Sequence, residues 1–326
     1  MGLSDDLAKS IRSGDRGALA RGITLIESRR PEDCGAAEAL LSSLLPHSGN
    51  SVRIGITGAP GVGKSTLIET LGTKLCQDGK RLAVLAVDPS SSVTGGSILG
   101  DKTRMDKLSR QENAFIRPSP GGGTLGGVAS RTQEAMLLCE AAGYEVVMVE
   151  TIGTGQSEVA VHNMVDFFLV MLSPAAGDEL QGIKRGMMEL ADAVLVHKAD
   201  GDLMAAANRT AQQCMMAMRV LHAGDHEAPA VLTGSSIEGT GIVEVWQRIE
   251  QEIARRRDSG LMQQRRSQQS VEWLDRNLQD ALLEDMLTNA SAAKELAAAR
   301  ERVASGKQVA TAAARSILRR YREGSA

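Results

Sequence analysis

Short apolar runs recur along the middle of the chain, and each is followed by a glycine-rich or polar segment and then by a helical pattern. Runs that are apolar throughout are typical of parallel strands whose two faces are both covered. We therefore expect an α/β fold, with a mostly parallel sheet covered by helices, over residues 49–255. The expected strands are 53–57, 82–87, 114–116, 146–149, 167–172, 193–196 and 230–232.

Both ends of the chain have a different pattern. Residues 1–48 predict an N-terminal helical segment with apolar positions at helical spacing. Residues 256–326 contain no strand-like run, and an apolar stripe at spacings of three and four predicts a C-terminal helical extension. The stripe consists of Val271, Leu274, Leu278, Leu282 and Met286. It either packs on the chain's own core or forms a dimerisation arm, and the arm is the hypothesis taken forward.

Composition excludes some classes of function. Lys and Arg number 37 against 40 Asp and Glu, and Phe, Tyr and Trp number 3, 2 and 2, so we expect no nucleic-acid partner. The four cysteines lie far apart, which argues against a zinc site or a disulfide framework. No apolar stretch approaches the roughly 18 residues of a membrane span, and the first residues do not resemble a signal peptide. We expect a cytoplasmic protein with no membrane partner.

The most specific motif is GAPGVGKS at residues 58–65, which matches the phosphate-loop pattern G-x-x-x-x-G-K-S/T. It follows an expected strand and precedes an expected helix, which is the context that the motif requires. Glycines let consecutive N–H groups point at phosphate oxygens, while Lys64 reaches the β- and γ-phosphates and Ser65 binds Mg²⁺. The expected phosphate-binding residues are Gly58, Ala59, Pro60, Gly61, Val62, Gly63, Lys64, Ser65 and Thr66.

Carboxylates near the ends of two further strands suggest a magnesium site. Asp88 and Glu150 end strand-like runs, and Asp101 lies in a glycine-rich segment. Mg²⁺ prefers a few hard oxygen ligands and retains several waters. We therefore expect Ser65, Asp88, Asp101 and Glu150 to bind it directly or through water. The plainer interpretation of each acid is a solvated or helix-capping carboxylate.

A switch element follows Glu150. Gly153 lies three residues later and resembles the glycine of the D-x-x-G element of GTPases, with Glu in place of Asp, so its amide would contact the γ-phosphate. Gln156 is a candidate for positioning water, although it lies three residues beyond the glycine rather than next to it. The expected catalytic residues are Lys64, Asp101, Glu150 and Gln156.

The segment LVHKADGD resembles the N-K-x-D element that reads guanine. Asp200 would accept from the N1–H and exocyclic amine of guanine, donors that adenine does not present in this arrangement. Lys198 would lay its stem along the base, and Ser235 and Ser236 resemble the last base-contacting loop. His197 stands where the element has Asn. We expect a loop-bracing hydrogen bond to be lost or rearranged and nucleotide affinity to fall, with guanine selectivity kept.

Six segments together resemble the methylmalonyl-CoA mutase-associated GTPases, the MeaB or ArgK-type family of P-loop NTPases, over about residues 5–254: GAPGVGKST, AVDPSSS, GGSILGDKTRM, PSPGGGTLGGV, ETIGTGQSEVAV and DELQGIKRG. The resemblance implies a homodimeric GTPase with GTP/GDP and Mg²⁺ as cofactors. It also implies protection of an adenosylcobalamin-dependent methylmalonyl-CoA-type mutase and gating of cofactor delivery, with the adenosyltransferase as a further candidate partner. Asp178, Gln181 and Lys184 match the family's third switch, which couples GTPase to partner.

Two alternatives belong to other classes of function. A metallochaperone GTPase for another metalloenzyme would need Cys and His ligands near the switches, and the five histidines show no such cluster in the sequence. A kinase, as in an older label of the family, would need a pocket for a substrate hydroxyl with a base, and no candidate for one is evident. Metal titration separates the first alternative from a chaperone GTPase, and the fate of the transferred phosphate separates the second.

Overall fold

The computed structural model describes residues 3–28, 30–87, 105–118, 125–151, 157–174, 185–224 and 228–324. The chain divides into two compact units, Met1–Gln269 and Ser270–Ala326, and the division falls inside one long helix, α13 (Leu261–Thr288). No helix of the described ranges combines the length and the hydrophobicity that a membrane crossing requires.

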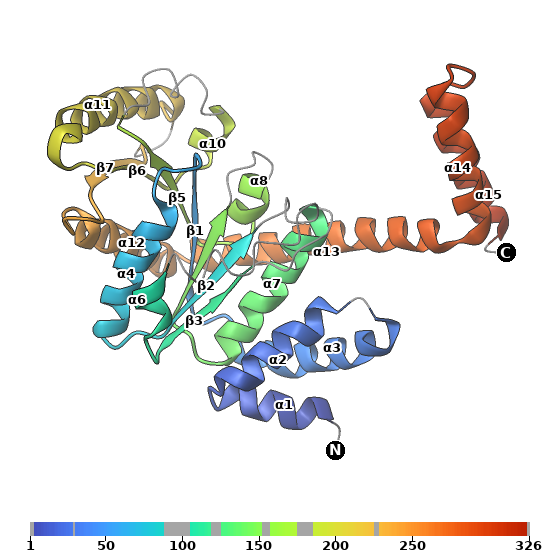
Figure 1. Cartoon of the computed structure of the whole chain (residues 1–326), viewed down its shortest axis with the longest axis horizontal. Helices are drawn as coiled ribbons and strands as arrows, with labels where there is room; N and C mark the ends of the chain where they lie inside the picture. Colours follow the sequence, from blue (N-terminus) through green and yellow to red (C-terminus); the bar gives the residue numbers. More distant parts are fainter. Residues whose placement is uncertain are drawn as a thin grey trace. The chain divides into compact units, whose positions relative to one another are not determined.

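A seven-stranded sheet with the order β3-β2-β4-β1-β5-β6-β7 forms the centre of the first unit (Figure 1). All neighbouring strands pair in parallel. All seven strands lie where the apolar runs predicted them, so the expected α/β fold is confirmed. The strands are β1 (Val52–Gly58), β2 (Leu82–Val87), β3 (Ala114–Arg117), β4 (Val146–Thr151), β5 (Phe167–Leu172), β6 (Ala193–His197) and β7 (Ala230–Gly234).

Helices cover both faces of the sheet, which explains why the central strands are apolar throughout. Side chains of β2, β4 and β5 are buried along their whole length. One face packs against α4 (Lys64–Gln77), α6 (Asp106–Ser109) and α12 (Ile242–Asp258). The other packs against α7 (Leu125–Ala141), α8 (Ser157–His162), α10 (Arg185–Glu189) and α11 (Met204–Leu221). A short 3-10 helix, η2 (Gly201–Leu203), precedes α11.

The N-terminal segment is helical, as its spacing predicted, and it adds a further layer over α7 (Figure 1). Leu19, Ile23 and Ile26 are fully buried in the same cluster as α7. Asp15 begins the second helix by accepting a 2.6 Å hydrogen bond from the Ala18 amide, which satisfies one free N–H of the first turn. The segment comprises α1 (Leu3–Arg12), α2 (Arg16–Glu27), α3 (Pro31–Leu44) and η1 (Leu45–His47).

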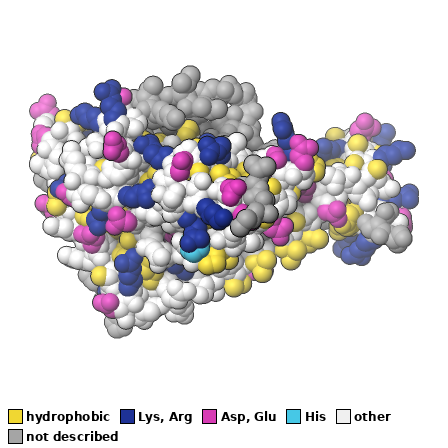
Figure 2. Space-filling model, turned by 90° about the horizontal axis from the view of Figure 1, so that it is seen from below, with side chains coloured by type: hydrophobic (Ala, Val, Ile, Leu, Met, Phe, Trp, Pro, Cys, Tyr) yellow, Lys and Arg dark blue, Asp and Glu magenta, His cyan; other side chains and the backbone are white. Residues whose placement is uncertain are grey.

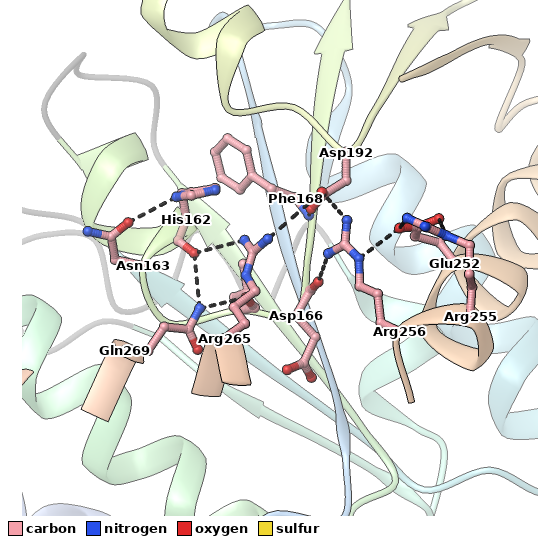
Figure 3. Close-up of polar contacts among 11 residues, drawn as sticks. His162, Asn163, Asp166, Phe168, Asp192, Glu252, Arg255, Arg256, Arg265 and Gln269 are labelled. Carbon is pink, nitrogen blue, oxygen red and sulfur yellow. Dashed lines mark hydrogen bonds and ion pairs between the residues drawn. The ribbon is translucent and has the colours of Figure 1, made fainter. Parts of the chain in front are cut away.

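A polar network holds α12 to the end of the sheet at which β5 and β6 begin (Figure 3). Arg256 lies at its centre. Its guanidinium donates to the Asp166 carbonyl at 2.6 Å, to the Asp192 carboxylate at 2.5 Å and to the Glu252 carboxylate at 2.7 Å. Asp192 also accepts a 2.7 Å hydrogen bond from the Phe168 amide, so one carboxylate joins α12 to the start of β5.

The second and third turns of α13 are fixed to the same end of the sheet. Arg266 makes a paired contact with the Asp166 carboxylate, at 2.8 Å from Nε and 2.6 Å from Nη2, and Gln269 donates to the Val165 carbonyl at 2.9 Å. Paired Arg–carboxylate contacts are among the stronger polar interactions in proteins. The beginning of α13 is therefore held firmly to the first unit.

The second unit holds the remainder of α13, α14 (Ala290–Ala304) and α15 (Ala310–Gly324). Asn289 caps α14 by accepting from two amides at 3.1 Å. The two last helices pack through small side chains, with Ala292, Ala299, Ala313 and Ile317 buried and Met286 packed against them. The predicted helical extension is therefore present.

The apolar stripe on α13 is largely exposed within its unit. Val271, Leu274, Leu278 and Leu282 are each 55–66% exposed. Hydrophobic side chains lie in a row along the C-terminal extension in Figure 2. Of the five stripe residues, only Met286 contributes to the small core of its own unit.

We predict that Arg256→Met lowers the free energy of unfolding by about 3 kcal/mol, because it removes the buried guanidinium that joins the carboxylates of Asp192 and Glu252. The matched control is Arg255→Met, since Arg255 contacts the same Glu252 at 2.6 Å but its side chain is 63% exposed, against 13% for Arg256. An exposed pair contributes less than about 1 kcal/mol. Urea denaturation followed by circular dichroism measures both, and equal losses in the two variants would contradict the assignment.

Candidate functional site

The phosphate-loop motif lies where an open parallel sheet binds ligands. β1 ends at Gly58, α4 begins at Lys64, and β1 is flanked by β4 and β5 at the middle of the sheet. Ligands of such sheets bind at the carboxyl ends of the strands, where the strand order reverses. Gly61 and Gly63 have φ of 80° and 101°, a conformation that favours glycine and lets the loop turn tightly before the helix.

Lys64 folds back over the loop that precedes it. Its Nζ donates to the carbonyl oxygens of Gly58 at 2.8 Å and Ala59 at 3.1 Å. Burial lowers the pKa of Lys64, and the carboxylates of Glu150 and Glu158 partly oppose that shift. A phosphate anion next to the ammonium would raise the pKa again, so the site favours an anionic ligand.

Ser65 and Glu150 meet across the gap between α4 and β4. The Ser65 hydroxyl donates to Glu150 Oε1 at 2.8 Å, and Glu150 is buried at the end of its strand. Behind them, Thr151 donates to Thr57 at 2.9 Å and joins β4 to β1. Two hard oxygens next to a lysine are ligands that suit Mg²⁺ beside a phosphate. Among the described residues, no group of three or more His, Cys, Asp or Glu could hold a metal ion.

These groups share one cavity of about 520 Å³, within the range typical of small-molecule sites. The cavity brings together most of the predicted phosphate loop, the predicted metal residues Ser65 and Glu150, and Lys198 of the predicted base loop. Its lining is Pro60, Gly61, Gly63, Lys64, Ser65, Thr66, Ala86, Glu150, Thr151 and Lys198. The motifs are separate in sequence, and the structure shows that they face the same space.

The loop after β6 is held against the phosphate loop by Lys198. Its φ of 58° lies in the left-handed region, which is uncommon for a residue other than glycine and costs of order 1–3 kcal/mol. In this conformation Lys198 Nζ donates to the Gly61 carbonyl at 2.7 Å. The Ala199 amide donates to the Gly234 carbonyl at 3.1 Å, so the loops after β6 and β7 are also joined.

Asp200 is fixed by the loop that follows β7. The buried Ser235 hydroxyl donates to Asp200 Oδ2 and accepts from the amides of Ile237 and Glu238, both at 3.2 Å. A carboxylate oriented in this way can accept paired hydrogen bonds from a purine that presents two adjacent N–H donors. Guanine has that arrangement.

His197 corresponds to the second of the two expected outcomes, a rearranged hydrogen bond. Its ring makes one contact on each side. Nδ1 lies 2.8 Å from the Val62 carbonyl oxygen, and Nε2 lies 2.7 Å from Ser236 Oγ. The hydrogen bond that Asn would make is therefore rearranged, not lost, because the imidazole spans the gap between the two loops.

Several predicted residues lie outside the described residues. They are Asp88, Asp101, Gly153, Gln156, Asp178, Gln181 and Lys184. Among the described residues, sequence reasoning missed Ala86, Thr151 and Glu158. Thr151 lies next to Glu150 at the end of an apolar run, and this position could have identified it. Glu158 is buried near Lys64, and its carboxylate partly opposes the lowering of the Lys64 pKa by burial.

The fold and this site define the class of the protein, which is a P-loop GTPase. The model of the family described as "Methylmalonyl Co-A mutase-associated GTPase MeaB" matches residues 19–291. This chain therefore belongs to the MeaB family of methylmalonyl-CoA mutase-associated GTPases.

Three similar proteins illustrate the range of the family. The chain is 49% identical over 317 residues to a Mycobacterium tuberculosis (strain H37Rv) protein named "Probable GTPase Rv1496", covering 96% of this chain and 94% of that protein. It is 42% identical to the mouse protein "Methylmalonic aciduria type A homolog, mitochondrial", covering 98% and 79%. A solved structure, described as that of an LAO/AO transport system kinase, matches with a TM-score of 0.77 and 36% identity over 98% of each chain.

Lys64→Ala is expected to weaken GDP binding by roughly 100-fold, because it removes a charge-assisted contact to phosphate. Lys74→Ala is the matched control, since Lys74 belongs to the same helix but makes an exposed ion pair with Asp78. Calorimetric titration of GDP and phosphate release from GTP measure both variants. Full GTPase activity in Lys64→Ala would contradict the assignment of residues 58–65 as the phosphate loop.

Proposed function

We propose that this GTPase binds GTP and GDP with the phosphates over residues 58–66 and the guanine against the loops that carry Lys198, Asp200 and Ser235. One observation carries the proposal. Lys64, Ser65, Glu150 and Lys198 line a single cavity, although Lys198 lies more than 130 residues from the phosphate loop in sequence. Asp200 does not line this cavity, but it follows Lys198 by two residues and is oriented by Ser235. An anion-binding loop beside such a carboxylate matches the two ends of a guanine nucleotide.

Mg²⁺ fits the Ser65–Glu150 pair. The Ser65 hydroxyl would bind the ion directly, and Glu150 would bind it or one of its waters, which is supported by the 2.8 Å distance between the two oxygens. When bound, the ion neutralises charge on the β- and γ-phosphate oxygens. Asp88 and Asp101 remain proposed as further ligands from the sequence.

Within hydrolysis, this chain's own residues bind and orient the nucleotide. Lys64 stabilises negative charge on the phosphates, while the loops around His197 and Ser235 fix the base and hence the direction of the triphosphate. Gln156 is the proposed water-positioning residue, and its distance from Gly153 in sequence leads us to propose slow hydrolysis without a partner. A group supplied by the partner would then accelerate the reaction.

We propose that the partner is an adenosylcobalamin-dependent mutase of the methylmalonyl-CoA type. The chain protects this enzyme and gates the loading of its cofactor, with the adenosyltransferase as a second partner. The family description and the name of the mouse relative support a mutase-associated role. Asp178, Gln181 and Lys184 are the proposed residues that couple GTP hydrolysis to the mutase.

A capture experiment tests this partner. The purified chain, loaded with a non-hydrolysable GTP analogue, should retain a cobalamin-dependent mutase from an extract of its own cells. Lys64→Ala should retain less, because it cannot hold the GTP-bound state, and Lys74→Ala should match the wild type. The absence of a mutase with every nucleotide, together with recovery of a urease or hydrogenase maturation complex, would overturn the proposal.

The kinase alternative is favoured by one observation, which is that the similar solved structure bears the name of a transport system kinase. It is tested with GTP labelled on the γ-phosphate. Release of all label as inorganic phosphate, in the presence and absence of the mutase, supports a GTPase that acts on its partner by conformational change. Label retained on a protein or small molecule would support a kinase.

We also propose that the chain forms a homodimer through the exposed stripe of α13. Val271, Leu274, Leu278 and Leu282 recur at spacings of three and four, as in a helix that packs along a second helix. Four large apolar side chains that remain exposed in their own unit are expected to be covered in solution. A second copy carries the same stripe and can pack against it in a self-complementary way.

Leu278→Lys is expected to weaken the dimer at least roughly tenfold, because it would bury an unpaired ammonium in the apolar contact. Gln279→Lys introduces the same charge at the adjacent exposed position and should leave the dimer intact. Light scattering across a dilution series gives the dissociation constant of each variant. A dimer of unchanged affinity in Leu278→Lys would place the interface elsewhere.

A further inference from the structure

The His197 side chain is almost completely enclosed between two loops. It is the last residue of β6 and is only 3% exposed. On one side it contacts the phosphate loop at Val62, and on the other it contacts Ser236, both through its ring nitrogens. One rigid ring therefore connects the loop after β1 with the loop after β7.

The hydrogen-bond partners determine the tautomer of this ring. The Val62 carbonyl can only accept, so Nδ1 carries the hydrogen. Nε2 is then an acceptor, and it faces both the Ser236 hydroxyl at 2.7 Å and the Ser236 amide, whose N–H donates to it at 3.3 Å. A doubly protonated ring would direct a donor at the Ser236 N–H, so the geometry selects the neutral form.

The electrostatic surroundings agree with that form. Burial lowers the pKa of His197, and the positive charge of Lys198 acts in the same direction. The carboxylate of Asp200 and the hydrogen bond to the Val62 carbonyl oppose this shift without reversing it. The ring is thus held neutral between two loops, with each nitrogen committed to one of them.

The phosphate loop is shaped to receive the ring. Gly63 has φ of 101°, and a Cβ at that position would lie 2.6 Å from His197 Nδ1 and 2.7 Å from Cε1. Carbon atoms do not approach so closely, so the imidazole packs directly on the glycine backbone. His197 therefore holds the phosphate loop in two ways, by packing on Gly63 and by its hydrogen bond to the Val62 carbonyl.

We propose that His197 is a positioning residue that locks the phosphate loop to the guanine-reading loops, so that the two halves of the nucleotide site are held as one unit. This inference rests on the proposed placement of guanine at Lys198, Asp200 and Ser235. Both nitrogens are needed. An Asn amide can occupy the place of Nδ1 and reach Val62 but falls short of Ser236, and a Gln amide can occupy the place of Nε2 but leaves Val62 unpaired.

The test measures GDP affinity by calorimetry in His197→Ala, His197→Asn and His197→Gln. Each lost hydrogen bond is expected to weaken binding several-fold, so Asn and Gln should lose roughly 3- to 10-fold and Ala roughly 10- to 100-fold. The steady-state loss should appear in KM for GTP more than in kcat, because the ring contacts the loops and not the γ-phosphate. Thermal unfolding of the nucleotide-free variants identifies any that fail to fold, and Asn and Gln keep the test valid if Ala does.

A double-mutant cycle with Ser236→Ala distinguishes a lock from simple packing. If the ring acts by joining the loops, the loss caused by His197→Gln should shrink at least about threefold once the Ser236 hydroxyl is absent. Additive losses would mean that the ring only fills space. GDP affinity within about twofold of wild type in His197→Ala, or tighter binding in His197→Asn, would overturn the proposal.

Asp200→Asn separates this inference from the placement of guanine. An amide can donate where the carboxylate accepts, so the variant should weaken GDP and strengthen xanthosine diphosphate. If it does so while the His197 variants bind normally, the lock is wrong and the guanine site stands. If Asp200→Asn leaves GDP affinity unchanged, guanine binds elsewhere and both ideas fail.

Discussion

The nucleotide site depends on one constraint. A loop that directs its N–H groups at an anion must find hydrogen-bond donors for its own carbonyl groups. A nest of this kind turns consecutive amides toward the ligand and leaves the carbonyls on the other side. Here, donors from three side chains meet those carbonyls. Lys64 contacts Gly58 and Ala59, Lys198 contacts Gly61, and His197 contacts Val62.

This arrangement explains why the loop after β6 matters to phosphate binding. Two of the three donors come from His197 and Lys198, which adjoin each other at the end of a strand two places from β1. The strained backbone of Lys198 is offset by the contact that it permits. If guanine binds as proposed, the dipeptide that supports the phosphate loop also belongs to the base-binding loop.

The sequence predicted the sheet and the phosphate loop because both are local signals. Apolar runs mark buried strands, and the phosphate-loop motif occupies the single contiguous segment 58–65. It could not predict the role of His197, since that depends on Val62 and Ser236, which lie 135 and 39 residues away. Comparison with the Asn that is usual at this position suggested that a hydrogen bond would be lost or rearranged. A residue pattern could not decide between the two, because it does not show the distance between the loops that the side chain has to span. The same limit applies to Arg256, since two of its partners, Asp166 and Asp192, lie 90 and 64 residues away.

The Ser65–Glu150 contact gives the site a second connection, on the opposite side of β1. β4 and β5 flank β1. Glu150 lies near the end of β4 and His197 ends β6, so the nucleotide would be held from both sides of β1. The two connections differ in chemistry. The His197 lock is neutral and buried and does not depend on the γ-phosphate, whereas the Ser65–Glu150 pair faces the cavity where a metal and phosphate would replace it. Loss of the γ-phosphate would therefore bear on the Ser65–Glu150 pair and not on the contacts of His197.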